Sequence, residues 1–238
     1  MSAENKKLGL KKVSSSAQVT EFLNQVSALS TIKSGHGRGR LLFAMDATAS
    51  REPAWDRACH LQAEMFHATD GLGGLEVQLG FFRGYGECKT SNWFSSASDL
   101  VRLMQKVKCV GGRTQLCKIL RHTVRETKEK HVDALVFVGD SFEEDIDEVC
   151  DVAGELGVLG VPIFVFQEGV DDIARVAFQQ IVRLTKGAHC NFDLSSAKLL
   201  RDLLSAVAVF AAGGYDALEN FSGQTGRTEI KQIASQLK

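Results

Sequence analysis

A continuous apolar run that stops at an aspartate constrains the fold of this chain more than any other feature. The run is Leu41 to Met45, LLFAM, and Asp46 follows it directly. Apolar residues without alternation fit a short strand that is buried on both faces, as in the middle of a parallel sheet. Sheets of this kind bind ligands beyond the carboxyl ends of their strands. We therefore expect the sheet to be centred on this run and a binding site to begin at Asp46.

Two hydroxyl residues, Thr48 and Ser50, follow the aspartate at alternate positions. One carboxylate and two neutral hydroxyls can serve as oxygen ligands for a hard divalent cation such as Mg²⁺. They make a poor catalytic triad, because no histidine lies nearby in the sequence to activate either hydroxyl. The pattern is short and occurs freely in loops, so by itself it leaves both a metal site and an ordinary loop open.

Strand and helix patterns alternate along the rest of the chain. Apolar runs predict further strands at 75–82, 134–138 and 161–169 and a short one within 187–194. Helical spacing predicts helices at 53–69, 98–107, 115–130, 171–186 and 195–212. A further helix is expected after Ser141 and Glu144, which have the spacing of a capping box.

The turn sequence RGYGE, residues 83–87, predicts that residues 88–94 return as an antiparallel edge strand. The other strands are separated by helices, and right-handed crossovers make such strands parallel. The expected fold is therefore α/β, with a doubly wound, mostly parallel sheet, one antiparallel edge strand and helices on both faces. In such a sheet the loops after the parallel strands share one edge.

The order Asp46, Thr48, Ser50 resembles D-x-S-x-S, the first motif of the metal-ion-dependent adhesion site (MIDAS) of von Willebrand factor A (VWA) domains. The resemblance implies a threonine after a glycine-rich turn and an aspartate after a later strand. Thr114, in VGGRTQL, and Asp140, in DALVFVGD, stand in these two contexts. The likeness covers about residues 40–212, and its motifs are specific as a set.

The resemblance implies a Mg²⁺ or Mn²⁺ ion held by Asp46, Thr48, Ser50, Thr114 and Asp140. Neutral hydroxyls would leave much of the ion's charge for one outside ligand, which in the family is typically an Asp or Glu of a protein partner. The chain then resembles a divalent-metal-dependent protein-binding module rather than an enzyme. Analogy with intracellular members suggests a place in an AAA-ATPase-type assembly. Arg113 and Ser141 depart from the commonest family residues beside Thr114 and Asp140.

Two other interpretations stay open. A Mg²⁺-dependent hydrolase or phosphoryl-transfer enzyme could use a similar sheet, but it would need a nucleophile or a base beside the ion. Phosphatases with a D-x-D-x-T motif have a second carboxylate where this chain has Thr48. A structural relative with a lost site is disfavoured, because all five positions keep oxygen-bearing side chains.

Charge and cysteine content restrict the partners and the compartment. The chain has 28 Lys and Arg against 29 Asp and Glu, so it has no overall field to attract nucleic acid or an anionic membrane. Its six cysteines include no C-x-x-C pair, as expected for reduced thiols in the cytosol. The amino terminus lacks the apolar core of a secretory signal, and the apolar segment 198–213 is short for a membrane span. We expect a cytoplasmic protein.

One domain with two extensions is expected. The divisions are a disordered basic arm at 1–14, a helix and Gly-rich linker at 15–40, the VWA-like domain at 41–212 and a C-terminal tail at 213–238. The linker KSGHGRGR, 33–40, is not expected to bind nucleotide, because it precedes a strand and lacks the ending of a phosphate-binding P-loop. Its basic residues are expected to be solvated, as runs of charge usually are. The acids Glu143, Glu144, Asp145 and Asp147 fit a first helical turn better than extra metal ligands.

Overall fold

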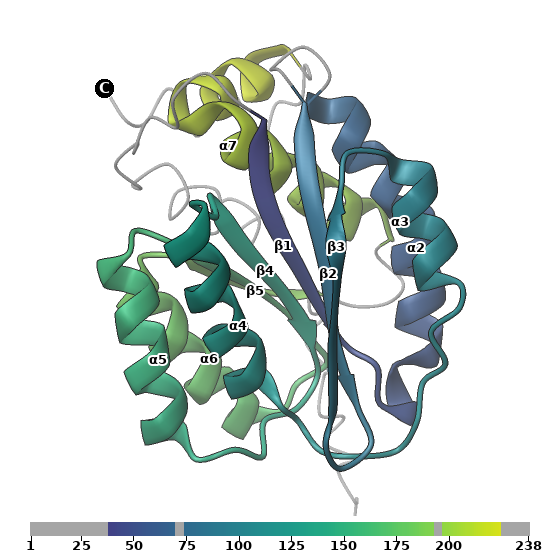
Figure 1. Cartoon of the computed structure of the whole chain (residues 1–238), viewed down its shortest axis with the longest axis vertical. Coiled ribbons are helices and arrows are strands. Elements are labelled where there is room, and N and C mark those ends of the chain that lie inside the picture. The colour runs from purple at the N-terminus through teal and green to yellow at the C-terminus, as the bar shows by residue number, and fades with distance from the viewer. Residues whose placement is uncertain (1–37, 70–73, 193–196, 225–238) are drawn as a thin grey trace, which may run out of the picture.

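A six-stranded sheet forms the middle layer of the protein (Figure 1). The computed structural model describes residues 38–69, 74–192 and 197–224. The strand order is β3-β2-β1-β4-β5-β6, and every neighbouring pair is parallel except β2 with β3. The strands are β1 (Gly39–Asp46), β2 (Leu75–Arg83), β3 (Glu87–Phe94), β4 (Ala134–Gly139), β5 (Ile163–Glu168) and β6 (Ala188–Phe192). The predicted sheet, with its antiparallel edge strand, is confirmed.

Helices cover both faces of this sheet, as predicted. One face carries α2 (Glu52–Thr69), α3 (Ala97–Met104) and α7 (Ala197–Gln224). The other carries α4 (Leu116–Glu129), α5 (Ile146–Val158) and α6 (Asp172–Thr185). A short 3-10 helix, η1 (Ala49–Arg51), joins β1 to α2. Among the described residues, no helix has both the length and the hydropathy that crossing a membrane requires.

The central strand β1 separates two apolar cores. Leu41, Phe43 and Met45 pack with α2, α3 and α7, whereas Leu42 and Ala44 pack with α4, α5 and α6. None of the five is more than 1% exposed. Full burial of a large apolar side chain contributes about 1.5–3 kcal/mol relative to its exposure. A strand without a polar face is stable only where both faces are covered, which explains its position in the centre.

Two helix ends differ from their predictions. Helix α3 ends at Met104 instead of continuing to residue 107, and α7 continues past the predicted end at Ala212. Gly214, with a φ of 70°, interrupts α7, but Leu218 beyond it is buried in the core. Residues 215–224 therefore form a second helical segment after the kink, and Leu218 packs this segment against the core. The predicted arm at 1–14 and the helix after it lie outside the described residues.

A basic residue predicted to be solvated is buried. Strand β1 begins at Gly39, so Arg40 belongs to the strand and is only 5% exposed. A Cβ atom at Gly39 would lie 2.3 Å from the carbonyl oxygen of Ala211, so the strand can start here only with glycine. The Arg40 guanidinium lies 3.8 Å from the centre of the Trp93 ring, a distance suited to a cation–π contact.

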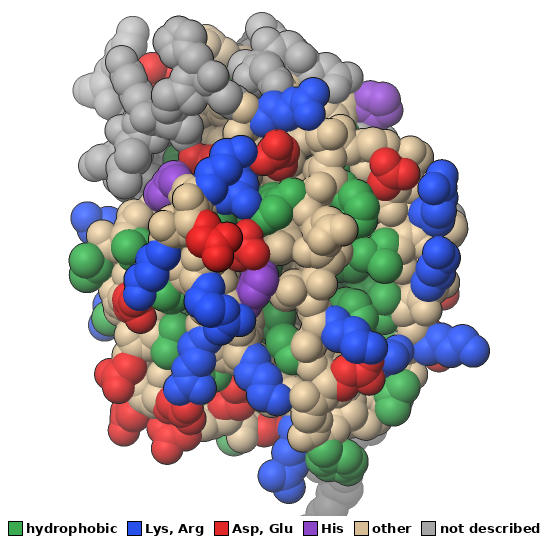
Figure 2. Space-filling model, viewed as in Figure 1, with side chains coloured by type: hydrophobic (Ala, Val, Ile, Leu, Met, Phe, Trp, Pro, Cys, Tyr) green, Lys and Arg blue, Asp and Glu red, His purple; other side chains and the backbone are tan. Residues whose placement is uncertain are grey.

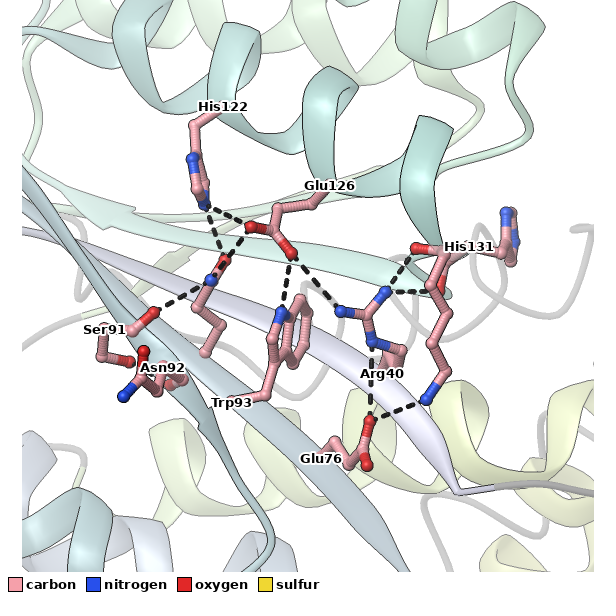
Figure 3. Close-up of polar contacts among 10 residues, drawn as sticks. Arg40, Glu76, Ser91, Asn92, Trp93, His122, Glu126 and His131 are labelled. Carbon is pink, nitrogen blue, oxygen red and sulfur yellow. Dashed lines mark hydrogen bonds and ion pairs between the residues drawn. The ribbon is translucent and has the colours of Figure 1, made fainter.

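Glu126 of α4 links Arg40 to the edge of the sheet (Figure 3). Its carboxylate pairs with Arg40 at 3.4 Å and accepts a hydrogen bond from the Trp93 indole at 2.7 Å. Gln78 of β2 lies between Glu126 and His122, with its Oε1 2.8 Å from the His122 ring nitrogen. Burial lowers the pKa of His122, so the ring is neutral at pH 7. These contacts fasten β1, β2 and β3 to α4.

Replacing Glu126 with glutamine should lower the free energy of unfolding by about 2 kcal/mol, because the buried Arg40 would lose one of its two partly buried counter-charges. Urea unfolding measures the change. The matched control is Glu148→Gln, which breaks an ion pair from the same helix α4, Arg121 with Glu148, both about half exposed. That control should change stability by less than about 1 kcal/mol. Equal effects of the two substitutions would contradict a structural role for the Glu126 contacts.

Candidate metal centre

The candidate site lies at the point in the sheet where the strand order reverses. β1 is flanked by β2 on one side and by β4 on the other, so successive strands are added in opposite directions from it. Asp46 ends β1, and Asp140 follows the last residue of the parallel neighbour β4. Ligands of doubly wound sheets bind at such switch points. The two predicted carboxylates are therefore placed at the expected edge of the sheet.

The Asp46 side chain has one fixed and one free oxygen. Oδ1 accepts a hydrogen bond from the backbone N–H of Thr48 at 2.7 Å. Oδ2 is buried and has no hydrogen-bond partner in the described part of the chain. Burial raises the pKa of Asp46 to about 6; the hydrogen bonds from Thr48 and the nearby Arg51 oppose the shift, and Asp140 adds to it. A buried carboxylate oxygen without a donor is costly, so this atom needs a proton or a cation.

Three further predicted ligands stand next to one another. The hydroxyl oxygens of Thr48 and Ser50 are 3.4 Å apart, and Ser50 donates a hydrogen bond to Asp140 Oδ2 at 3.2 Å. Ser50 is exposed, whereas Asp46 at its base is only 1% exposed. The first motif and Asp140 are therefore in contact, in a site that is buried at Asp46 and exposed to solvent at Ser50.

Thr114 reaches the same edge through a different partner. Its hydroxyl oxygen accepts a hydrogen bond from the Glu143 N–H at 3.0 Å, and its own N–H donates to the Glu143 carboxylate at 3.3 Å. Glu143 lies just after Asp140 in the sequence. Within the described residues, Thr114 makes no hydrogen bond to Asp46, Thr48 or Ser50. Hydrogen bonds thus connect four predicted ligands in the order Asp46, Thr48, Ser50 and Asp140, and the fifth, Thr114, is held by the loop after β4.

The loop before Thr114 is bound to the ends of β1 and β2. Val110 N–H donates to Ala47 at 3.0 Å, and Arg113 N–H donates to Gly84 at 3.1 Å. Gly112 touches the backbone of Gly84 so closely that a Cβ atom there would lie 2.0 Å from its carbonyl oxygen. The glycine is therefore required by the contact between two loops, a reason that the sequence did not reveal.

The acids after Asp140 support the loops and helices, and one prediction about them is wrong. Ser141 and Glu144 do not form a capping box, because α5 starts later and Asp145 is its N-cap, accepting from Asp147 and Glu148 N–H groups. Glu144 instead accepts from the first N–H groups of α4. Figure 2 shows acidic side chains gathered at the lower left, where α5 lies in Figure 1.

Arg51 is a site residue that the sequence analysis missed. It ends η1, is 1% exposed, and places its Nη1 3.9 Å from Asp140 Oδ2. The same nitrogen forms an ion pair with Glu168, the last residue of β5. Burial lowers the pKa of Arg51, while Asp140 and Asp46 raise it. Its position directly after the Asp46–Ser50 motif could have suggested a role, but only the fold places Glu168 beside it.

The donor set fits a hard cation that accepts neutral oxygens. In the described ranges no cluster of three or more His, Cys, Asp or Glu side chains could hold a metal, so an ion here would depend on hydroxyls as well as carboxylates. The unpartnered Asp46 Oδ2 is a position that such an ion would satisfy. Cys109 interacts electrostatically with Asp46, but burial raises the pKa of its thiol to about 11. The thiol therefore stays protonated at neutral pH and is a poor nucleophile.

Comparisons with known proteins give similarity in structure only. No protein-family model matches the sequence, and no curated protein matches it either. A solved structure of "von Willebrand factor type A from Catenulispora acidiphila" is similar with a TM-score of 0.58, 13% identity and 73% of this chain covered. The "SpRpn10 VWA domain" has a TM-score of 0.54, 14% identity and 70% of this chain covered.

A mussel byssus protein, "proximal thread matrix protein 1", described "with zinc occupied MIDAS motif", has a TM-score of 0.54, 13% identity and 72% of this chain covered. The matched part spans 43% of the Catenulispora chain, 46% of the mussel chain and 94% of the SpRpn10 domain. At these identities the likeness concerns the fold, and the first and third of these proteins extend well beyond it.

Asp46→Asn should stabilise the metal-free protein at pH 7 by roughly 1–3 kcal/mol. The folded-state pKa of about 6 lies above the ordinary 3.8, so between these pH values the folded protein holds a proton that the unfolded chain has released. Stability of the natural protein therefore falls as pH rises from about 4 to about 6, and asparagine removes this loss. Urea unfolding with chelator at several pH values measures it. An asparagine variant that is less stable at pH 7 would contradict the prediction.

Gly112→Ala should lower the free energy of unfolding by roughly 2 kcal/mol or more, because a methyl group there must displace the backbone of Gly84. The neighbouring Gly111→Ala is the control, since a Cβ atom at Gly111 meets nothing within 4 Å. That variant should be neutral or slightly stabilised. Thermal and urea unfolding of both variants would show the difference, and equal losses would contradict the loop contact.

Proposed function

Since the chain has the fold of von Willebrand factor A domains, we propose that it is a divalent-metal-dependent protein-interaction module. Mg²⁺ or Mn²⁺ would be held by Asp46, Thr48, Ser50, Thr114 and Asp140. Such an ion supplies a positive charge with one position open to an outside oxygen. The partner's ligand would be the carboxylate of an Asp or Glu on a protein surface.

The observation that carries the proposal is the buried, unpartnered Oδ2 of Asp46. It lies on the residue whose other oxygen is fixed by Thr48 and whose pKa is raised by burial and by Asp140. A cation bound there would replace the proton that burial favours and would remove an unsatisfied acceptor. Ser50 and Asp140, already in contact, supply oxygens on the exposed side.

Each residue of this chain would have a distinct task. Asp46 would give the ion a buried anionic base, and its Thr48 hydrogen bond keeps the carboxylate in one orientation. Asp140 would bring charge at the solvent side, where Ser50 fixes one of its oxygens. Thr114 is positioned by Glu143, so ion binding and the loop after β4 would be coupled. The surrounding exposed loops would then decide which acidic partner fits.

The compartment and the assembly belong to the same proposal. A cytoplasmic location fits the cysteines whose side chains the structure describes, at 88, 109, 117, 150 and 190, because all five are free thiols. A place beside an AAA-type ATPase follows only from analogy with other intracellular proteins of this fold. The partner itself is defined here by its chemistry, an accessible carboxylate.

Calorimetric titration of Mg²⁺ and Mn²⁺ into chelator-treated protein tests the site. The natural protein should bind one ion and melt at a higher temperature when loaded, because the ion binds only the folded state. Asp46→Ala should abolish both effects, and Thr48→Val should weaken binding about tenfold or more. The matched control is Asp147→Asn, which removes an exposed acid from the first turn of α5 and should leave binding unchanged.

Absence of binding by the natural protein, or equal loss in Asp147→Asn, would contradict the metal site. Dependence on a side-chain carboxylate is tested separately with short peptides whose C-termini are amidated: those with a central Asp or Glu should bind the Mn²⁺-loaded protein, and those with Asn or Gln in its place should not. Hydrolysis of phosphate esters that depends on Asp46 would instead favour an enzyme.

A further inference from the structure

The proposed metal site does not explain why the positively charged side chain of Arg51 is buried beside it. Arg51 is almost fully buried beside Asp140 and forms an ion pair with Glu168, which is itself largely buried. Arginine stays charged in proteins, so this position carries a permanent positive charge next to a site intended for a cation. Such a charge repels a metal ion and would weaken its binding. Its presence therefore needs a reason.

Stability alone is a poor reason for the arginine. Arg51 Nε and Nη2 are buried and, among the described residues, have no hydrogen-bond partner. A buried ion pair that is only partly hydrogen-bonded contributes little compared with apolar side chains of similar size. An apolar residue at position 168 could end β5 without any buried charge, as the apolar residues Ile163 to Phe166 do earlier in the strand. The pair costs desolvation without full compensation, which points to a role in the site.

The charges around the site give that role. Asp46, Asp140 and Glu168 carry three negative charges when ionised, and Arg51 removes one of them. The remaining charge of minus two is balanced by a doubly charged ion. Without Arg51, the same three carboxylates would be balanced by a triply charged ion. Buried or partly buried charges within a few ångströms interact strongly, because solvent screens them little.

We propose that Arg51, held in place by Glu168, determines the charge selectivity of the metal site, so that divalent cations are favoured over trivalent ones. This inference rests on the proposed metal site but assigns two residues that lie outside its ligand set. Arg51 acts through the net charge and through its contact with Asp140, and Glu168 keeps the guanidinium from neutralising Asp140 completely. Both are specificity-determining residues without being ligands.

The test compares affinities for Mn²⁺ and Tb³⁺ by calorimetry in four proteins. Arg51→Met makes the site charge minus three, Glu168→Gln makes it minus one, and the double variant returns it to minus two, as in the natural protein. We expect the ratio of Tb³⁺ to Mn²⁺ affinity to rise about tenfold or more in Arg51→Met and to fall similarly in Glu168→Gln. The double variant should recover the natural ratio within about threefold.

The ratio separates selectivity from damage to the fold, since a distorted site weakens both ions. Arg51→Lys keeps the charge and should keep the ratio. If Arg51→Met does not fold, the comparison of Glu168→Gln with the double variant still changes only the Arg51 charge, and the ratio should be higher in the double variant. An unchanged ratio in folded variants that bind both ions would overturn the selectivity role while leaving the metal site intact. No ion binding by the natural protein would overturn both.

Discussion

The burial of the Asp46 carboxylate at the end of β1 is the constraint on which the rest of the site depends. The strand is apolar on both faces because it lies in the centre of the sheet. The aspartate that ends it is therefore buried as well. One carboxylate oxygen is satisfied locally by Thr48, and the other is not. Burial raises the pKa of Asp46, which means that the ionised carboxylate is unfavourable here unless a positive charge lies beside it.

The buried charged side chains at the two ends of β1 differ in how many partners they have. At its start, Arg40 pairs with Glu76 and Glu126 and lies against the Trp93 ring, so its guanidinium has two counter-charges, although its Nε makes no hydrogen bond within the described residues. At its end, Asp46 keeps a free oxygen and Arg51 keeps free N–H groups. A network with nearly all its groups satisfied serves the fold, whereas unsatisfied groups beside an open edge are typical of a binding site. The contrast within one strand supports the location of function at its carboxyl end.

Two loops that are distant in sequence, the one before Thr114 and the one after Asp140, are held at the candidate site by different contacts. The segment before Thr114 is fastened to Ala47 and Gly84 by backbone hydrogen bonds, and the segment after Asp140 is fastened to Thr114 by Glu143. Asp140 and Thr114 are therefore connected through the loop that carries Glu143. Glu143 and Glu144, which the sequence led us to expect in the first turn of a helix, lie before α5 and instead support this edge by accepting hydrogen bonds from the Thr114 and Leu116 N–H groups.

The sequence by itself determined the sheet, its centre and the order of its elements, because apolar periodicity and turn residues act locally along the chain. It also pointed to Asp46, Thr48, Ser50 and Asp140, which hydrogen bonds connect at the switch point, since parallel strands end on one edge. Only the tertiary structure decided that Arg40 is buried, that Glu144 caps α4 and that Arg51 meets Glu168. Each of these depends on a partner far away in sequence, and no local pattern of residues records which distant charge will lie beside it.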